Sequence, residues 1–235
     1  MNNQNLFKET FEFGETRGVI LTDKKDAIAT AKNSLKENKK KLEEYVRRNP
    51  KFLYSLKPVN VNEDSPTVVK LMAEASQKAG VGPMAAVAGV LADLAVEAML
   101  AKGANTAIVE NGGEVSAVSN KPMNIALSVG DHPLSKKVGF KLENFPVGVA
   151  TSSGVYSHAI SFGEAEAVTI FAENAGLADA VATAVGNIIA GDNPQKAVEN
   201  GVKKALSING VKGVLIIYKG TVGMAGQIPK ILKIV

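Results

Sequence analysis

The sequence predicts an α+β fold in which helices cover one face of an antiparallel or mixed sheet. Short alternating strands are separated by turn residues, and the predicted helices come in pairs between these runs. The 235 residues are 46% hydrophobic and 21% charged, which is typical of a globular protein with a substantial core. We expect a single domain over residues 1–235, with N-terminal strands and a basic helix in 1–60 and the core in 61–235.

The N-terminal region predicts two short strands and one charged helix. Alternating apolar residues in 7–22 flank Gly14, and a helix follows over residues 24–48 and stops before Pro50. Residues 24–57 hold eleven Lys/Arg against four Asp/Glu, a balance of +7. Because aromatic residues are sparse there and no nucleic-acid-binding motif is present, we interpret this helix as a solvated basic face and expect no nucleic acid partner.

Two further helices are predicted before the next strands. The first has Ser65 as N-cap, Pro66 at the first helical position and Gly80 near its end. The second runs from residue 83 to 102 and is apolar enough to suggest a membrane span. Asp93 interrupts it, as does a glutamate four residues later, so we expect a buried helix of a soluble protein and no membrane partner.

The remainder alternates strands with two more helices. A helix is expected from about Ala175 to Ala190, with Asn174 as N-cap, and another from the GDNP turn to about Ser207. The expected strands are TAIVE, EVSAV, MNIALSV, KVGFKLE, PVGVAT, YSHAIS and AVTIFAE, followed by GVLIIYKG and IPKILKIV.

Composition narrows the chemistry of the site. The chain contains no cysteine, so disulfides, zinc–thiolate sites and thiol nucleophiles are excluded. Its first residues lack the apolar core of a signal peptide, and we expect a cytoplasmic protein, compatible with a homo-oligomer.

The helix GLADAVATAVGN places an acid and a hydroxyl on one face. Asp179 and Thr183 are four residues apart, so their side chains project from the same side of a wall of small residues. Two interpretations stay open: a ligand or metal site, or a packed helix with a solvent-facing acid and a threonine bonded to its own turn.

Two loops and one histidine are further candidates. Gly112 and Gly113 precede Glu114, where the backbone can approach a ligand or simply form a hairpin turn. Small polar residues that suit phosphate or sugar follow a later strand: Thr151, Ser152, Ser153 and Gly154. His158, close behind them, is either structural or a group that transfers a proton.

Taken together and in this order, these motifs resemble the ApbE-like family of flavin transferases. The resemblance covers residues 81–189 and is most specific at Ala178–Ala184, which is similar to the family's aspartate–threonine helix. It implies a T-fold-like architecture, FAD as substrate or ligand, and Mg²⁺ held by Asp179, Thr183 and a backbone carbonyl. Gly112, Gly113, Glu114 and residues 151–154 would line the flavin nucleotide, and His158 or Asp93 would act as the base.

The sequence departs from the usual transferase pattern at two places. Ala88 stands where the family has a lysine, and no acid–proline–glycine turn follows His158. The chain therefore resembles the shorter branch of the family found in archaea and anaerobes, which has been linked to sulfur assimilation. Two functions remain open: transfer of FMN, or another nucleotide-derived group, to an acceptor such as a protein hydroxyl, and a non-catalytic binding or accessory role.

One internal sequence similarity, called the sequence echo below, suggests a duplicated unit. Residues 91–97 parallel residues 177–183, which places Asp93 in register with Asp179. In alanine-rich helices such a match can also arise by chance.

Overall fold

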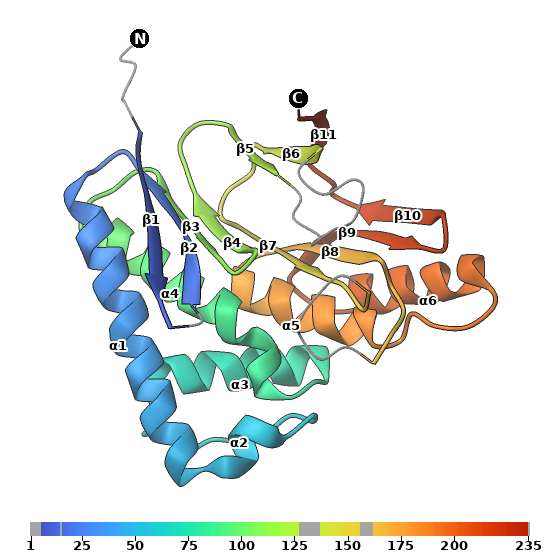
Figure 1. Ribbon diagram of the computed structural model, residues 1–235, viewed down its shortest axis with the longest axis horizontal. Helices are drawn as coiled ribbons and strands as arrows, with labels where there is room; N and C mark the ends of the chain where they lie inside the picture. The colour runs from blue at the N-terminus through green and yellow to red at the C-terminus, as the bar shows by residue number, and fades with distance from the viewer. Residues whose placement is uncertain (1–5, 15, 127–136, 156–161, 235) are drawn as a thin grey trace.

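The computed structural model describes residues 6–14, 16–126, 137–155 and 162–234. A large antiparallel sheet has the strand order β1-β2-β3-β4-β7-β8-β9-β10, and a small one has the order β11-β6-β5 (Figure 1). The strands are β1 (Phe7–Phe13), β2 (Thr16–Thr22), β3 (Ala107–Asn111), β4 (Glu114–Val118), β5 (Met123–Ala126), β6 (Val138–Leu142), β7 (Val147–Ser152), β8 (Ala167–Ala172), β9 (Val211–Tyr218), β10 (Thr221–Gly226) and β11 (Lys230–Lys233). The helices are α1 (Asp26–Arg48), α2 (Pro50–Tyr54), α3 (Thr67–Ala79), the 3-10 helix η1 (Pro83–Ala86), α4 (Val87–Ala101), α5 (Ala175–Gly186) and α6 (Pro194–Leu206).

The large sheet consists of two halves with the same order of elements. In the first half β1 and β2 precede helices and β3 and β4 follow them, and the second half repeats this with β7, β8, α5, α6, β9 and β10. The halves join where β4 pairs with β7, with Val115 opposite Val149. This order matches the expected α+β fold and its duplicated unit.

The helices and the small sheet cover opposite faces of the large sheet. The main core lies under the helices and includes Ile20, Leu35, Met72 and Ile170. A second core, containing Phe140 and Phe171, lies between the two sheets (Figure 1). The sequence predicted helices on one face, but the separate small sheet was not predicted.

Several element boundaries differ from the prediction. Pro66, and not Ser65, occupies the N-cap position of α3, while Gly80 ends that helix in the left-handed conformation as expected. Helix α5 ends at Gly186, four residues before the predicted end. Strand β10 was missed, because its sequence TVGMAG is half glycine and small residues. The strand expected at 156–161 lies outside the described residues.

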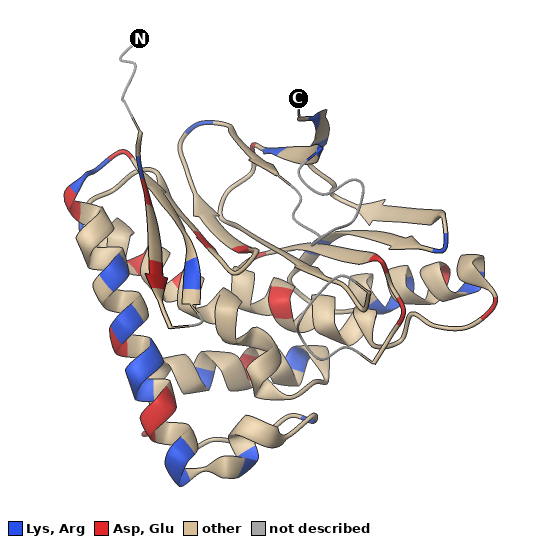
Figure 2. Ribbon diagram, in the orientation of Figure 1, with Lys and Arg blue, Asp and Glu red and all other residues tan. Residues whose placement is uncertain are grey.

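The charged helix α1 has an exposed face, whereas the apolar helix α4 is packed between other elements. Figure 2 shows Lys and Arg distributed along α1, whose buried residues include Leu35 and Leu42. The stretch Pro83–Ala101 is long and apolar enough to cross a membrane, but 50% of its apolar window is buried inside the protein. Helix α4 packs against α1, α5 and β3, which is the setting expected of a core helix.

Candidate functional site

Helix α5 presents one polar stripe to a pocket of about 450 Å³. Asp179, Thr183 and Asn187 follow each other at four-residue spacing, and all three line this pocket. The helix starts where the Asn174 side chain accepts a hydrogen bond from the Leu177 N–H at 2.8 Å, as predicted. Its other faces are buried, so the stripe is the polar part of an otherwise apolar helix.

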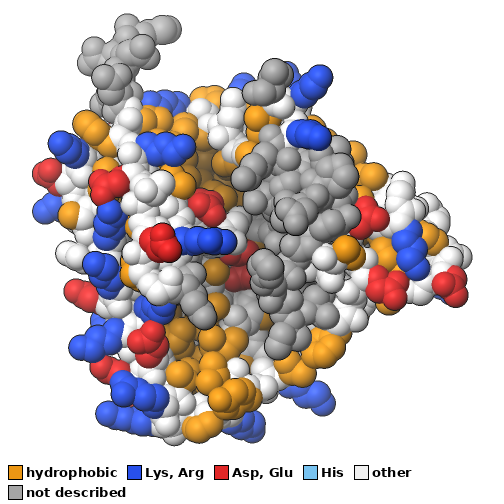
Figure 3. All heavy atoms as spheres, in the orientation of Figure 1, with side chains coloured by type: hydrophobic (Ala, Val, Ile, Leu, Met, Phe, Trp, Pro, Cys, Tyr) orange, Lys and Arg blue, Asp and Glu red, His pale blue; other side chains and the backbone are white. Residues whose placement is uncertain are grey.

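The opposite walls of the pocket come from four segments distant in sequence. Glu114 projects from the start of β4, and residues 53–56 contribute the end of α2 and the turn after it. The stretch from Val81 to Val87 forms a further wall, and Phe162 completes the lining. Figure 3 shows apolar side chains gathered low on the viewed face, where Figure 1 shows α2. Leu53 and Tyr54 at the end of α2, and Leu56 after it, are exposed.

Asp179 is tied to the start of the neighbouring helix. Its Oδ2 accepts a hydrogen bond from the Gly89 N–H of α4 at 3.1 Å. A glycine is required there, because a Cβ atom at Gly89 would lie 2.2 Å from the Ala175 carbonyl oxygen. Desolvation by burial raises the pKa of Asp179 to about 7, even though the backbone N–H bonds act in the opposite direction.

Glu114 adds a second carboxylate to the same pocket. Burial raises the pKa of Glu114 well above its usual range, and the negative charge of Asp179 contributes in the same direction. Among the described residues that line the pocket there is no lysine or arginine. Within the described lining, two desolvated acids therefore face one space without a lysine or arginine to neutralise them.

Thr183 supplies a hydroxyl beside the two acids. Within the described residues, its side chain makes no hydrogen bond to the backbone of its own turn or to another residue. The interpretation of Thr183 as a threonine bonded to its own turn is therefore not supported. Hydroxyl and carboxylate oxygens are the ligand types that Mg²⁺ prefers.

Asp93 lies on the other side of the α4–α5 contact, away from the pocket. Its Oδ1 and Oδ2 accept hydrogen bonds from the Ala175 and Gly176 N–H groups at 2.9 and 2.8 Å. It thus binds the first amides of α5, a favourable position for a carboxylate. Burial raises the pKa of Asp93, although these bonds and one from Ser116 oppose the shift. This geometry gives Asp93 a tethering role, and its predicted role as a base is not supported by any contact with the pocket.

The glycine turn separates two cavities. Gly112 and Gly113 have φ angles of 69° and 116°, which glycine adopts without strain, and the Gly113 N–H donates to Glu110 Oε1 at 2.7 Å. Glu114 lines the pocket on the helix side. Gly113 lines a cavity of about 760 Å³ between the two sheets, whose other lining residues are mostly apolar.

The hydroxyl cluster lies near the C-terminal end of α5 and outside the pocket lining. Thr151 and Thr169 share a hydrogen bond at 2.9 Å between neighbouring strands. Ser152 faces Gly186, and the Gly154 N–H donates to the Ala165 carbonyl at 2.9 Å. Ser153 is buried, and its hydroxyl accepts from the Val155 N–H. His158 lies outside the described residues.

Among the residues that line the pocket and that sequence reasoning missed are Asn187, Tyr54 and Phe162. The four-residue step from Asp179 to Thr183 continues to Asn187, so this spacing was a usable signal. No sequence signal connected Tyr54 or Phe162 with α5, because their approach depends on the packing of distant segments.

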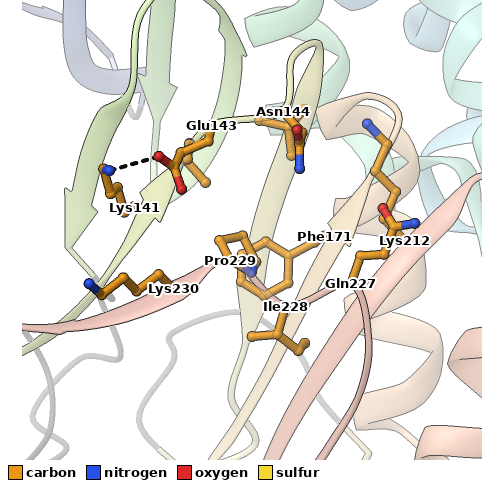
Figure 4. Close-up of a pocket in the computed structure, with 11 residues that line it drawn as sticks. Lys141, Glu143, Asn144, Phe171, Lys212, Gln227, Ile228, Pro229 and Lys230 are labelled. Atoms are coloured by element: carbon orange, nitrogen blue, oxygen red, sulfur yellow. Dashed lines mark hydrogen bonds and ion pairs between the residues drawn. The ribbon is translucent and has the colours of Figure 1, made fainter.

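A separate small pocket of about 160 Å³ lies on the other side of the large sheet (Figure 4). Phe171 and Pro229 line it together with three lysines. Lys141 pairs with Glu143 at 2.7 Å, and the Lys212 Nζ donates to the Pro146 carbonyl at 2.6 Å. Because two of its lysines are already paired, we do not include this pocket in the candidate site.

The protein has the same fold as flavin transferases of known structure. The structure superimposes on the apo form of the flavinyl transferase ApbE of Pseudomonas stutzeri with a TM-score of 0.62, at 14% identity and over 94% of both chains. An ApbE protein of Thermotoga maritima gives a TM-score of 0.61, at 17% identity and over 95% of this chain and 97% of the other. At such identities the likeness shows the shared fold.

The sequence match identifies the family. Residues 4–209 match the family described as AbpE bacteria, and the chain belongs to it. A UPF0280 protein of Methanococcus vannielii is 37% identical over 97% of this chain and 94% of its own length. A UPF0280 protein of Methanopyrus kandleri is 41% identical over 94% of this chain and 90% of its own length. The resemblance to ApbE-like proteins and the expected fold class are therefore confirmed.

Proposed function

We propose that this protein binds FAD together with Mg²⁺ and transfers FMN, or another nucleotide-derived group, to an acceptor hydroxyl. The observation that carries the proposal is the pair Asp179 and Glu114, two desolvated carboxylates that line one pocket without a lysine or arginine among its described lining residues. A divalent cation would neutralise this excess of negative charge. The flavin-transferase fold supports FAD as the substrate.

Asp179 and Thr183 are the residues that would hold the metal. In the described chain no three His, Asp or Glu side chains converge on one point. This suits Mg²⁺, which is held by one or two carboxylates and fills the rest of its shell with water and substrate phosphate. When bound, Mg²⁺ would neutralise charge on the pyrophosphate. The hydrogen bond from the Gly89 N–H to Asp179 Oδ2 would help to orient this carboxylate.

The two cavities fit a ligand with two ring systems. One cavity of about 450 Å³ and another of about 760 Å³ lie on either side of the Gly112–Gly113 turn. Because neither glycine carries a side chain, an extended dinucleotide can pass close to the backbone there. We propose that the pyrophosphate lies near this turn and Glu114, with one ring system in each cavity. Residues 151–154 remain candidate contacts for its sugar or phosphate groups.

In the transfer step, the acceptor oxygen would attack the FMN-side phosphorus of FAD. The new P–O bond forms as the bond to AMP breaks, and AMP leaves with the bridging oxygen. The pocket's contribution is to hold the phosphorus and the acceptor in line. We propose His158 as the group that takes the acceptor's proton, since both Asp93 oxygens are engaged by α5.

A non-catalytic binding or accessory role is the second candidate. The Gly154 N–H bonds the Ala165 carbonyl, and only ten residues of sequence, 155–164, separate these two positions. The sequence of this stretch lacks the acid–proline–glycine turn of typical transferases. In this case the protein would bind the nucleotide and leave an acceptor peptide unmodified.

Isothermal titration with FAD, ADP and FMN, each with and without Mg²⁺, tests the binding proposal. We expect FAD and ADP to bind only with Mg²⁺, because both contain the pyrophosphate that the metal would contact. Tight, metal-independent binding of FMN alone would contradict the proposal. Incubation with FAD, Mg²⁺ and a threonine-containing peptide, followed by mass spectrometry and assay of AMP, separates the two candidates. A flavinylated peptide with equimolar AMP establishes transfer, whereas binding alone supports the accessory role.

A further inference from the structure

The chain that follows residue 161 is fixed to the C-terminal end of α5. The Phe162 N–H donates to Asn187 Oδ1 at 3.1 Å, and the Glu164 N–H donates to the Ile189 carbonyl at 2.7 Å. Between them, Gly163 lies so close to α5 that a Cβ atom there would be 1.8 Å from the Gly186 carbonyl oxygen. These contacts determine where the backbone of Phe162 lies relative to the stripe of Asp179, Thr183 and Asn187.

Phe162 lines the pocket while its side chain remains largely unburied. It is 62% exposed, and two other exposed apolar residues of the lining are Tyr54 at 76% and Leu56 at 65%. The pocket therefore combines an acidic wall with exposed apolar and aromatic residues. Such residues beside a site for charged groups are suited to bind the planar ring of a ligand whose phosphates are held nearby.

We propose that Asn187 is a positioning residue: by accepting the Phe162 N–H, it holds the Phe162 ring where a planar heteroaromatic ring of the ligand packs against it. The inference rests on the proposed function. The ring belongs either to the flavin or to the adenine half of the dinucleotide, since both are planar and heteroaromatic. Asn187 acts through Phe162 and has no role in holding the metal.

The contact with Asn187 can be separated from other anchors of the same segment. Two residues after Phe162, Glu164 Oε2 accepts a hydrogen bond from the Tyr218 hydroxyl at 2.5 Å, and the Gly191 carbonyl, 2.8 Å away, is a second acceptor for the same proton. Tyr218 does not line the pocket. Tyr218→Phe therefore removes a neighbouring anchor without altering the pocket wall and serves as the matched control.

The binding test compares four ligands, each with Mg²⁺: inorganic pyrophosphate, ADP, FMN and FAD. For Asn187→Ala and for Phe162→Ala we expect FAD affinity to fall about tenfold, the size of one lost ring contact, while pyrophosphate affinity stays unchanged. The double variant should show no further loss, because both changes remove the same contact. A loss shared by ADP assigns the adenine ring, and a loss shared by FMN assigns the flavin ring.

A ligand-free measurement tests the anchor itself. Hydrogen exchange of the Phe162 amide should be faster in Asn187→Ala and unchanged in Asn187→Asp, which keeps an acceptor oxygen, and in Tyr218→Phe. Unchanged exchange in Asn187→Ala, additive losses in the double variant or equal losses for pyrophosphate would each overturn the inference. If the parent protein binds none of the four ligands, the proposed function fails, and the role of the ring fails with it.

Discussion

Asp93 and Asp179 each bind the first turn of the other's helix. Asp93 of α4 accepts the Ala175 and Gly176 N–H groups of α5, and Asp179 of α5 accepts the Gly89 N–H of α4. The arrangement is a local twofold in which two antiparallel helices exchange the same contact. Only Asp179 lies in the pocket with Glu114 and Thr183.

This exchange explains the sequence echo between residues 91–97 and 177–183. The echo relates the last helix of the first half of the sheet to the first helix of the second half, so it does not follow the repeated order of strands and helices. It reflects the contact between α4 and α5, where equivalent positions meet across the local twofold.

Substitution of the two aspartates by asparagine should separate metal binding from tethering. Asp179→Asn keeps an oxygen for the Gly89 N–H but loses the charge, so we expect Mg²⁺-dependent ADP affinity to fall by at least roughly 10-fold. Asp93→Asn should bind ADP as the parent does, since Asp93 does not line the pocket. Calorimetry at fixed Mg²⁺ measures both. Equal affinity in Asp179→Asn and the parent would refute the metal assignment.

Without a divalent cation, the protein should lose stability as the pH rises. Asp179 has a pKa of about 7 in the folded protein and 3.8 as its reference value, so between these values the folded state holds more protons than the unfolded state. The free energy of unfolding therefore falls as the pH rises from about 4 to about 7. Thermal melts in a chelator should show this decline for the parent and a smaller one for Asp179→Asn.

Addition of Mg²⁺ should reverse this loss, and increasingly so at higher pH. Metal binding requires the ionised carboxylate, so the affinity rises as Asp179 loses its proton near pH 7. A melting temperature that responds to Mg²⁺ equally at pH 5.5 and pH 8 would argue against Asp179 as a ligand.

Substitution of two helical glycines by alanine should have different effects on the free energy of unfolding. At Gly89 the new Cβ would lie 2.2 Å from the Ala175 carbonyl oxygen, so α4 and α5 must separate, at a cost of about 1–3 kcal/mol of unfolding free energy. At Gly186 the closest atom would be 3.4 Å away, and alanine should be neutral or stabilising. Denaturant melts of both variants measure this, and a neutral Gly89→Ala would show that α4 and α5 can separate at that point without cost.

The basic face of α1 should be dispensable for ligand binding. Lys40 and Lys41 are exposed, whereas Lys39 donates to Thr16 Oγ1 at 3.1 Å and contributes to the packing of α1. We therefore expect Lys40→Ala/Lys41→Ala to retain parental affinity for ADP with Mg²⁺. Salt-sensitive binding of the parent to duplex DNA, lost in this variant, would instead indicate a nucleic-acid role.

Local spacing in the sequence was sufficient to predict the α5 stripe. Alanine-rich composition and the Asn174 cap define the helix, and four-residue spacing alone places Asp179 and Thr183 on one face. The turns at Gly14 and Gly112–Gly113 could also be predicted from local sequence. Each depends only on residues adjacent in the chain and on glycine, which adopts a positive φ without strain.

Only the tertiary structure decided what faces that stripe. It brought Glu114, Tyr54 and Phe162 to the pocket from three distant segments, and it turned Asp93 away toward the first amides of α5. It also placed a second sheet on the face that the sequence left uncovered. The periodicity of apolar residues indicates which side of a helix or strand is buried. The segment that packs against that side depends on the packing of the whole chain, and no local sequence pattern specifies it.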